Sequence, residues 1–176
     1  VQNAPVFDFV RHFELESAWS VIDAHPFLDD DGSLYVYFNK HTDNSGFDKG
    51  IWGIKMKDWV TPDFQTLRCL TVPAFKSVDH TPGSVDGVVS DTSFSAADDS
   101  LNEGGYMLKH NGKYYLTYSG SHYQSKGYAV GYATSDQPLG PYKKYEANPI
   151  LSYHYLVHGP GHHCIVTSPD GRDLFI

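Results

Sequence analysis

The sequence predicts an all-β protein, and three observations lead to that prediction. Helical periodicity is almost absent, because Gly or Pro interrupts the apolar stripe wherever a run is long enough for a helix. Aromatic residues make up 15% of the 176 residues and occur beside 16 Gly and 10 Pro, which is typical of short strands joined by tight turns. Alternating or aromatic-rich runs recur between the turn residues, and four of them are expected to form strands: 34–38, 50–56, 114–118 and 128–133.

Three segments share one plan, in which a short strand, an Asp-Gly or Asn-Gly turn and an aromatic-rich strand follow each other. They are residues 22–38, 102–119 and 161–176. Both central residues of a type I′ turn need positive φ, so these dipeptides are strong hairpin signals. The stretch 72–102 is rich in Ser, Asp, Thr and Gly and is expected to form a long loop or insertion.

The spacing of the three turns indicates a repeat. The turn glycines Gly32, Gly112 and Gly171 are separated by 80 and then 59 residues. A period near 60, lengthened once by the long loop, suits the four-stranded blade of a β-propeller.

Ionisable residues occupy one register position of this repeat. Nine residues before each turn glycine the sequence has Asp23, Glu103 and His162. The innermost strands of a propeller run along its central channel, so their first residues converge on one face. We therefore expect two carboxylates and one imidazole to meet, although polar residues that merely begin strands at the solvent edge would give the same pattern.

The charge balance excludes several classes of partner. Thirteen Lys and Arg against 21 Asp and Glu leave a net charge of −8, and no basic patch is evident. This argues against nucleic acid and against an anionic membrane surface as partners. No run approaches the length of a membrane-spanning helix. Two cysteines without CxxC spacing leave the compartment open, so secreted and cytoplasmic locations are both compatible with the sequence.

An ordered succession of motifs resembles the family 43 glycoside hydrolases, from about residue 19 to residue 176. The motifs are VIDAHPF followed by DDDG at 21–32, NEGGY with NGKYYLTYS at 102–119, GYATS with PLGPY and NPIL at 131–151, and GPGHH at 159–163. The resemblance implies a five-bladed β-propeller of which this chain supplies about three blades. It also implies an inverting enzyme that cleaves arabinofuranosyl or xylosyl linkages in plant hemicellulose oligosaccharides.

The resemblance also implies a role for each residue of the register position. Glu103 would be the general acid that protonates the leaving oxygen. Asp23 would be the carboxylate that raises the pKa of this acid and orients it. His162, rather than His163, would face the channel and contact a hydrated metal ion, often calcium. The reaction itself would require no cofactor. Gly104-Gly105 replaces the more usual Gly-Pro after the acid.

The family's general base is an Asp of the first blade, and Asp8 lacks the motif around that residue. We therefore expect the base outside this sequence, and the remaining blades in residues outside it or in another chain. Within a single catalytic domain, 1–20 would end an earlier blade, 21–101 form a blade with the long loop, 102–160 form the next blade, and 161–176 start the following one.

Several alternatives stay open at this point. A non-catalytic sugar-binding propeller and a related five-bladed fructan-cleaving enzyme with a retaining nucleophile are the rivals for function. The run DDDG at 29–32 resembles part of a calcium loop, but a turn is favoured. His154, His158 and His162 have zinc-like spacing, but glycine and proline break any helix there. His122 and Tyr123 are the expected substrate-binding residues, ahead of Trp19, Trp52 and Trp59, because their turn should open toward the site.

Overall fold

The computed structural model describes residues 20–41, 50–73, 101–124, 127–172 and 174–176, and these residues form an all-β structure. The first sheet is an antiparallel meander in the order β1-β2-β3-β4, with β1 at Ser20–Leu28, β2 at Leu34–His41, β3 at Gly50–Met56 and β4 at Pro62–Thr71. No helix in the described part of the chain is long and apolar enough to cross a membrane.

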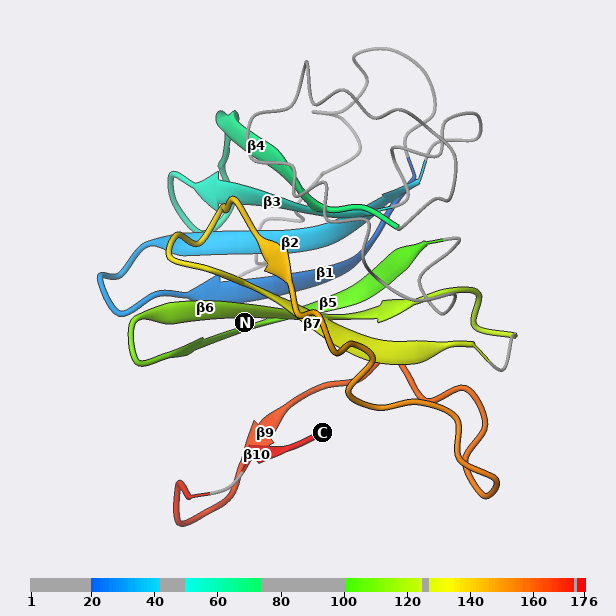
Figure 1. Cartoon of the computed structure of the whole chain (residues 1–176). Helices are drawn as coiled ribbons and strands as arrows, with labels where there is room; N and C mark the ends of the chain where they lie inside the picture. Colours follow the sequence, from blue (N-terminus) through cyan, green and yellow to red (C-terminus); the bar gives the residue numbers. More distant parts are fainter. Residues whose placement is uncertain (1–19, 42–49, 74–100, 125–126, 173) are drawn as a thin grey trace, which may run out of the picture.

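The second sheet repeats the plan of the first. Its order is β5-β6-β7-β8, with β5 at Asn102–His110, β6 at Lys113–Gly120, β7 at Ala129–Ser135 and β8 at Lys143–Lys144. A separate two-stranded hairpin follows, formed by β9 at Val166–Thr167 and β10 at Leu174–Phe175. The two four-stranded sheets lie one above the other, and the hairpin lies beyond the second sheet (Figure 1).

The sequence predicts most of these strands correctly, and it misses β4 and the two-residue β8. All four predicted strand runs fall within or largely within β2, β3, β6 and β7. β4 lies at the edge of its sheet, begins at a proline, carries polar residues and pairs irregularly with β3, so it lacks the alternating pattern of a regular strand. Most of the predicted long loop, residues 74–100, lies outside the described residues.

Aromatic and aliphatic side chains from both sheets form one core between them. Tyr37 and Ile51 of the first sheet and Leu116 and Tyr118 of the second are fully buried in this cluster. Tyr142 joins them, and its hydroxyl donates to the backbone carbonyl of Pro138 at 2.9 Å. Packing of this kind holds the two sheets together and fixes where their first strands begin.

A buried carboxylate links the turn of the first sheet to the second sheet. Asp29, at the end of β1, accepts hydrogen bonds from Lys109 Nζ and from the hydroxyl of Tyr114, both at 2.5 Å. Only 4% of the Asp29 side chain is exposed. Burial alone would raise the pKa of Asp29, but the hydrogen bonds from Lys109, Tyr114 and the Asp30 amide outweigh it and lower this pKa. The DDDG run therefore forms a turn that ties two sheets together.

The three turns differ, and this corrects one expectation from the sequence. Asn111 and Gly112 both have positive φ, at 51° and 74°, as a type I′ turn requires. Among the described residues of the other two turns only the glycine has positive φ, and its N–H donates three residues back, from Gly32 to Asp29 and from Gly171 to Ser168. The type I′ prediction is therefore wrong for these two hairpins, whose turns are longer.

Candidate active site

Asp23, Glu103 and His162 meet at the end of the sheets where β1 and β5 begin. One ligating atom of each side chain lies within 4.8 Å of those of the other two. The Nε2 atom of His162 lies 3.6 Å from Oδ1 of Asp23. Asp23 is on β1, Glu103 is on β5, and His162 lies in the segment that leads to β9. The structure thus brings together residues that are 80 and 59 positions apart in the sequence.

Left-handed backbone marks this site on all three segments. φ is 58° at Asp23, 58° at Gly104 and 51° at His162. Non-glycine residues with positive φ are uncommon and gather where a site constrains the chain. In β1 the two residues Asp23 and Ala24 form a bulge opposite β2, and in β5 the bulge is formed by Gly104 and Gly105.

The bulges change the register that the sequence predicts. Asp23 and His162 lie nine residues before their turn glycines and share the left-handed backbone, so they are structural equivalents. The equivalent residue of the second sheet is Gly104, and Glu103 precedes it by one position. Nine residues before the turn glycine Gly112 the sequence has Glu103 and not Gly104, because the turn between β5 and β6 is shorter than the other two turns. Glu103 joins the cluster from a regular paired position, opposite Ser119.

Tyr128 holds the carboxylate of Glu103. Its hydroxyl donates a hydrogen bond of 2.6 Å to Oε1 of Glu103, and the tyrosine is almost fully buried. Burial, followed by the hydrogen bond to Glu103, raises the pKa of Tyr128. The hydroxyl therefore stays protonated at neutral pH and acts as a donor, which fixes the orientation of the carboxylate.

Gly161 and Ser119 position the segment that carries His162. A Cβ atom at Gly161 would lie 2.2 Å from Cε1 of Tyr128 and 2.9 Å from Oγ of Ser119, so only glycine fits against the ring. The same Ser119 oxygen accepts a 2.7 Å hydrogen bond from the backbone N–H of His162. The histidine segment is therefore packed directly onto the residue that orients Glu103.

Asn39, on β2, braces the start of β5 from the first sheet. Its Nδ2 donates to the carbonyl of Asn102 at 2.6 Å, and its Oδ1 accepts from the N–H of Gly104 at 3.1 Å. The side chain is completely buried. The sequence analysis did not predict a role for Asn39 or Tyr128. Asn39 does have a sequence signal, because it is a polar residue directly after an aromatic strand run.

The two adjacent histidines have different surroundings. His162 is exposed and faces Asp23, whereas Nε2 of His163 lies 2.7 Å from the hydroxyl of Thr117. Burial, with a smaller contribution from the charge of His162, lowers the pKa of His163 to about 4. His163 is therefore neutral at physiological pH, and it is His162 that joins the two carboxylates.

The expected substrate-binding residues lie at the same end of the second sheet. His122 and Tyr123 are exposed, with stacked rings 4.7 Å apart, in the turn after β6. The N–H of Ser121 donates to the carbonyl of Leu101, which anchors this turn beside the start of β5. The described contacts of His122 and Tyr123 do not include the carboxylates of the cluster.

Other candidates from the sequence have different environments. Trp52 is a core residue, whereas Trp59 is 74% exposed; Trp19 and Asp8 lie outside the described residues. Within the described ranges, Asp23, Glu103 and His162 form the one group that could hold a metal ion, so the spacing of His154 and His158 does not produce a zinc site.

The donor set around His162 admits a calcium ion only with a shell of water. Calcium takes six to eight oxygen ligands, and the cluster offers two carboxylates and one imidazole nitrogen. The Oδ2 atom of Asp23 is buried and has no hydrogen-bond partner among the described residues, so one acceptor is free. The residues therefore fit a largely hydrated ion.

Known proteins are similar to this chain in sequence and in fold. The family model described as "Glycosyl hydrolases family 43" matches residues 3–176. The chain is 32% identical over 178 residues to a beta-xylosidase of Xylanibacter ruminicola, covering 85% of this chain and 50% of that protein. It is 28% identical over 155 residues to the Beta-D-galactofuranosidase xynD of Aspergillus niger, covering 88% of this chain and 36% of that protein.

A solved structure supports the same conclusion. The crystal structure of a thermostable family-43 glycoside hydrolase superposes with a TM-score of 0.68 at 34% identity, covering 88% of this chain and 47% of that one. The chain spans half or less of the length of these relatives. Because the family model covers almost the whole chain, and because the fold agrees, this chain belongs to family 43 of the glycosyl hydrolases.

Proposed function

We propose that the complete protein is an O-glycosyl hydrolase that cleaves arabinofuranosyl or xylosyl linkages in plant hemicellulose oligosaccharides with inversion. The observation that carries the proposal is the cluster in which Glu103, oriented by Tyr128, lies beside Asp23. The name of the Xylanibacter relative supports a xylosyl substrate, and that of the Aspergillus relative adds a furanosyl one.

In this mechanism Glu103 is the general acid. Oε1 is held by the Tyr128 hydroxyl, so Oε2 carries the proton and delivers it to the leaving oxygen. Asp23 is a like charge close by, which disfavours ionisation of Glu103 and keeps that proton in place until the bond breaks. The imidazole of His162 lies beside Asp23, with Nε2 3.6 Å from Oδ1.

The short distances argue that Asp23 is not the general base. Acid and base carboxyl groups of an inverting glycosidase lie about 6.5–9.5 Å apart, because a water molecule must fit between base and sugar. The oxygen atoms of Asp23 and Glu103 approach within 4.8 Å. Asp23 is therefore not the base in this mechanism, and we propose that the base lies outside this sequence, as the family resemblance implies.

We also propose the five-bladed propeller as the fold of the complete protein, with about three blades from this chain. Two four-stranded meanders whose first strands meet at one site support this arrangement (Figure 1). The greater length of the relatives is compatible with further blades. A hydrated calcium ion near His162 would supply positive charge and ordered water, and the protein ligands offered to it are His162 and Asp23.

The stereochemistry of the product tests this proposal. Carboxyl groups about 5–5.5 Å apart are typical of retaining enzymes, so the cluster also favours a second candidate in which Asp23 is a nucleophile, as in a fructan-cleaving enzyme.

The complete enzyme is incubated with xylosyl, arabinofuranosyl, galactofuranosyl and fructosyl substrates, and the first-formed anomer is read by proton NMR. An inverted pentose anomer supports the proposal, whereas a retained anomer makes Asp23 the nucleophile. Sugar binding without hydrolysis of any substrate would identify a non-catalytic carbohydrate-binding protein.

A further inference from the structure

A cavity lies at the opposite end of the first sheet from the catalytic cluster. It is open to solvent, has a volume of about 270 Å³ and is lined by the β1–β2 turn and the β3–β4 turn. Leu28 lines it at the end of β1, five residues beyond Asp23, which corresponds to about 17 Å along a strand. Figure 1 shows the turns that join β1 to β2 and β3 to β4 at the same end of the sheet. The cavity is therefore separate from the carboxylates.

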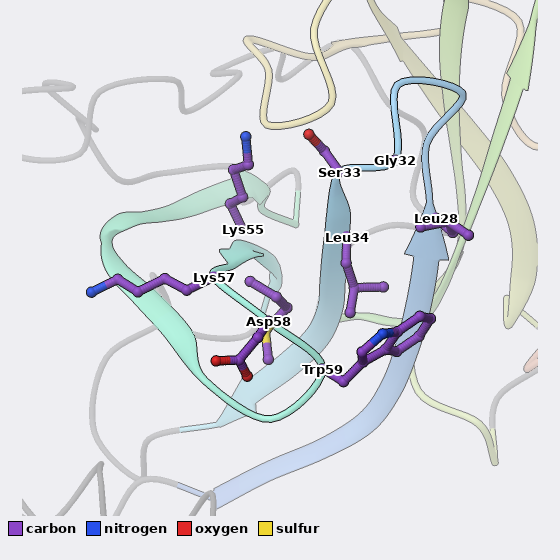
Figure 2. A pocket seen from close by; sticks show the side chains of 9 residues that line it. Leu28, Gly32, Ser33, Leu34, Lys55, Lys57, Asp58 and Trp59 are labelled. Atoms are coloured by element: carbon purple, nitrogen blue, oxygen red, sulfur yellow. The ribbon is translucent and has the colours of Figure 1, made fainter.

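The wall of the cavity combines an indole with apolar and charged groups. Figure 2 shows Trp59 beside Leu28 and Leu34, whereas Lys57 extends on the other side. Trp59 is 74% exposed, and no other large hydrophobic side chain in the first sheet or its turns reaches that exposure among the described residues. Exposure of an indole costs hydrophobic free energy that burial would recover, so a ligand that covers the ring gains that energy.

The turn that carries Trp59 is held in one conformation. Oδ1 of Asp58 accepts hydrogen bonds from the N–H groups of Val60 and Thr61, both at 2.9 Å. The N–H of Lys57 donates to the carbonyl of Thr61 at 2.8 Å, which closes the turn. The indole is thus attached to a fixed backbone, and little conformational entropy is lost when a ligand binds to it.

We propose that this cavity is a second carbohydrate site, which holds one or two neutral sugar rings of a xylan chain away from the hydrolytic centre. Sugar rings present slightly positive C–H groups that the negative face of an indole attracts, while hydroxyl groups find partners in Ser33, Lys55 and Asp58. A volume of 270 Å³ is just below that of pockets for drug-sized ligands, which suits one or two rings rather than a long segment.

The composition of the lining favours a sugar over a protein partner. Lys and Asp are depleted in the cores of protein–protein interfaces, and the cavity has Lys55, Lys57 and Asp58 in its wall. Lys57 also forms an ion pair with Asp63 at 4.0 Å, so the local charge is partly compensated and an anionic ligand is not required. This carbohydrate site rests on the proposed hydrolase function only for the class of polymer, which is a xylan.

Affinity electrophoresis of the complete protein in gels with soluble xylan tests this site. An inactive Glu103→Gln background prevents digestion of the polymer. Trp59→Ala should weaken retardation by the gel on the order of threefold to tenfold, and Trp59→Tyr should retain most of it because the aromatic face remains. The matched control is Tyr155→Ala, which removes a ring that is 75% exposed outside the cavity, and it should leave retardation unchanged.

The outcomes separate this proposal from the proposed function. With Glu103 intact, Trp59→Ala should hydrolyse a small aryl xyloside at the wild-type rate and act more slowly on polymeric xylan. Three outcomes would overturn the neutral-sugar site. The first is unchanged retardation of Trp59→Ala, and the second is an equal loss of retardation in Tyr155→Ala. The third is loss of binding in roughly 0.5 M NaCl, where exposed charges are screened. A change of oligomeric state alone would make the cavity a protein interface. If no glycoside is hydrolysed but Trp59→Ala still releases the polymer, the hydrolase proposal fails and the sugar site stands.

Discussion

The hydroxyl of Tyr128 lies 2.6 Å from Oε1 of Glu103 and donates a hydrogen bond to it. This contact fixes which oxygen of the carboxylate remains available for proton transfer. It also connects β5, which carries Glu103, to the histidine segment, because the ring of Tyr128 packs against Gly161.

Tyr128→Phe removes the donor and keeps the ring. A hydrogen bond to the ionised carboxylate favours that form, so its loss should help Glu103 retain its proton. In the complete enzyme we expect the alkaline limb of the pH–rate profile to move to higher pH, with a lower maximum rate. Tyr132→Phe, in the strand that follows Tyr128 but outside the site, is the control. An unchanged limb would show that Tyr128 does not act on the acid.

Gly161→Ala introduces a methyl group where there is no room for one. Its Cβ would lie 2.2 Å from Cε1 and 2.6 Å from Cδ1 of Tyr128, so the ring or the segment must move. Overpacking of this kind typically costs about 1–3 kcal/mol. We expect a lower free energy of unfolding and a loss of activity larger than that of Tyr128→Phe, measured by thermal unfolding and initial rates. Gly112→Ala is a poor control because of its positive φ, whereas Gln65→Ala changes an exposed side chain of β4. Wild-type activity in Gly161→Ala would contradict the packing argument.

Glu103→Ala tests the general acid directly. General acid catalysis contributes about 10²–10⁴-fold, and its benefit depends on how much the leaving group needs a proton. We expect a loss of that size on natural glycosides, whose leaving alcohols are poor, and a much smaller loss on aryl glycosides with acidic phenols. Steady-state kinetics on matched substrates measures the difference. Equal losses on both would place the acid at another residue.

Asp23→Asn removes a negative charge near Glu103. Because a like charge disfavours ionisation, the variant acid should lose its proton more easily, and the alkaline limb should move to lower pH. This direction is opposite to that expected for Tyr128→Phe, so the two profiles check each other. Asp30→Asn, at an exposed turn position, serves as the control. An alkaline limb at the same pH as in the wild type would mean that Asp23 orients Glu103 and does not affect its ionisation.

Asp29 should make stability depend on pH in the acid range. Its hydrogen bonds lower the pKa of its carboxyl group below the ordinary 3.8, so the unfolded chain binds this proton more tightly than the folded one. The stabilisation is therefore present above about pH 4 and is lost as the pH falls through the folded pKa. Asp29→Asn should reduce the free energy of unfolding at pH 7 by about 1.5–3 kcal/mol, the usual contribution of a hydrogen bond to a charged group.

Urea unfolding at pH 7 and at pH 3 measures this effect, and the gap between wild type and Asp29→Asn should narrow at pH 3. The matched control is Asp136→Asn, because Asp136 pairs with Lys113 at 3.6 Å on the surface. Exposed pairs contribute about 0–1 kcal/mol, so this variant should change little at either pH. A gap of constant size at both pH values would mean that the Asp29 ion pair does not stabilise the fold.

The sequence by itself determined the fold class, most strands and the three residues of the cluster. Period-2 alternation, aromatic runs and Asn-Gly or Asp-Gly turns are local signals, and they identify β2, β3, β6 and β7 without knowledge of the fold. The recurrence of the hairpin plan then pointed to Asp23, Glu103 and His162, which the structure brings within 4.8 Å.

Only the tertiary structure decided how that cluster is built. The one-residue offset of Glu103 depends on bulges and turn lengths, which are set by pairing between strands and not by the spacing of glycines. The roles of Tyr128 and Asn39 depend on contacts across 25 and 65 residues, and the exposure of Trp59 beside a cavity depends on two turns meeting in space. Such contacts follow from how the sheets pack, because all the neighbours of a buried hydroxyl or amide together determine its position. Sequence patterns contain information only about neighbours along the chain.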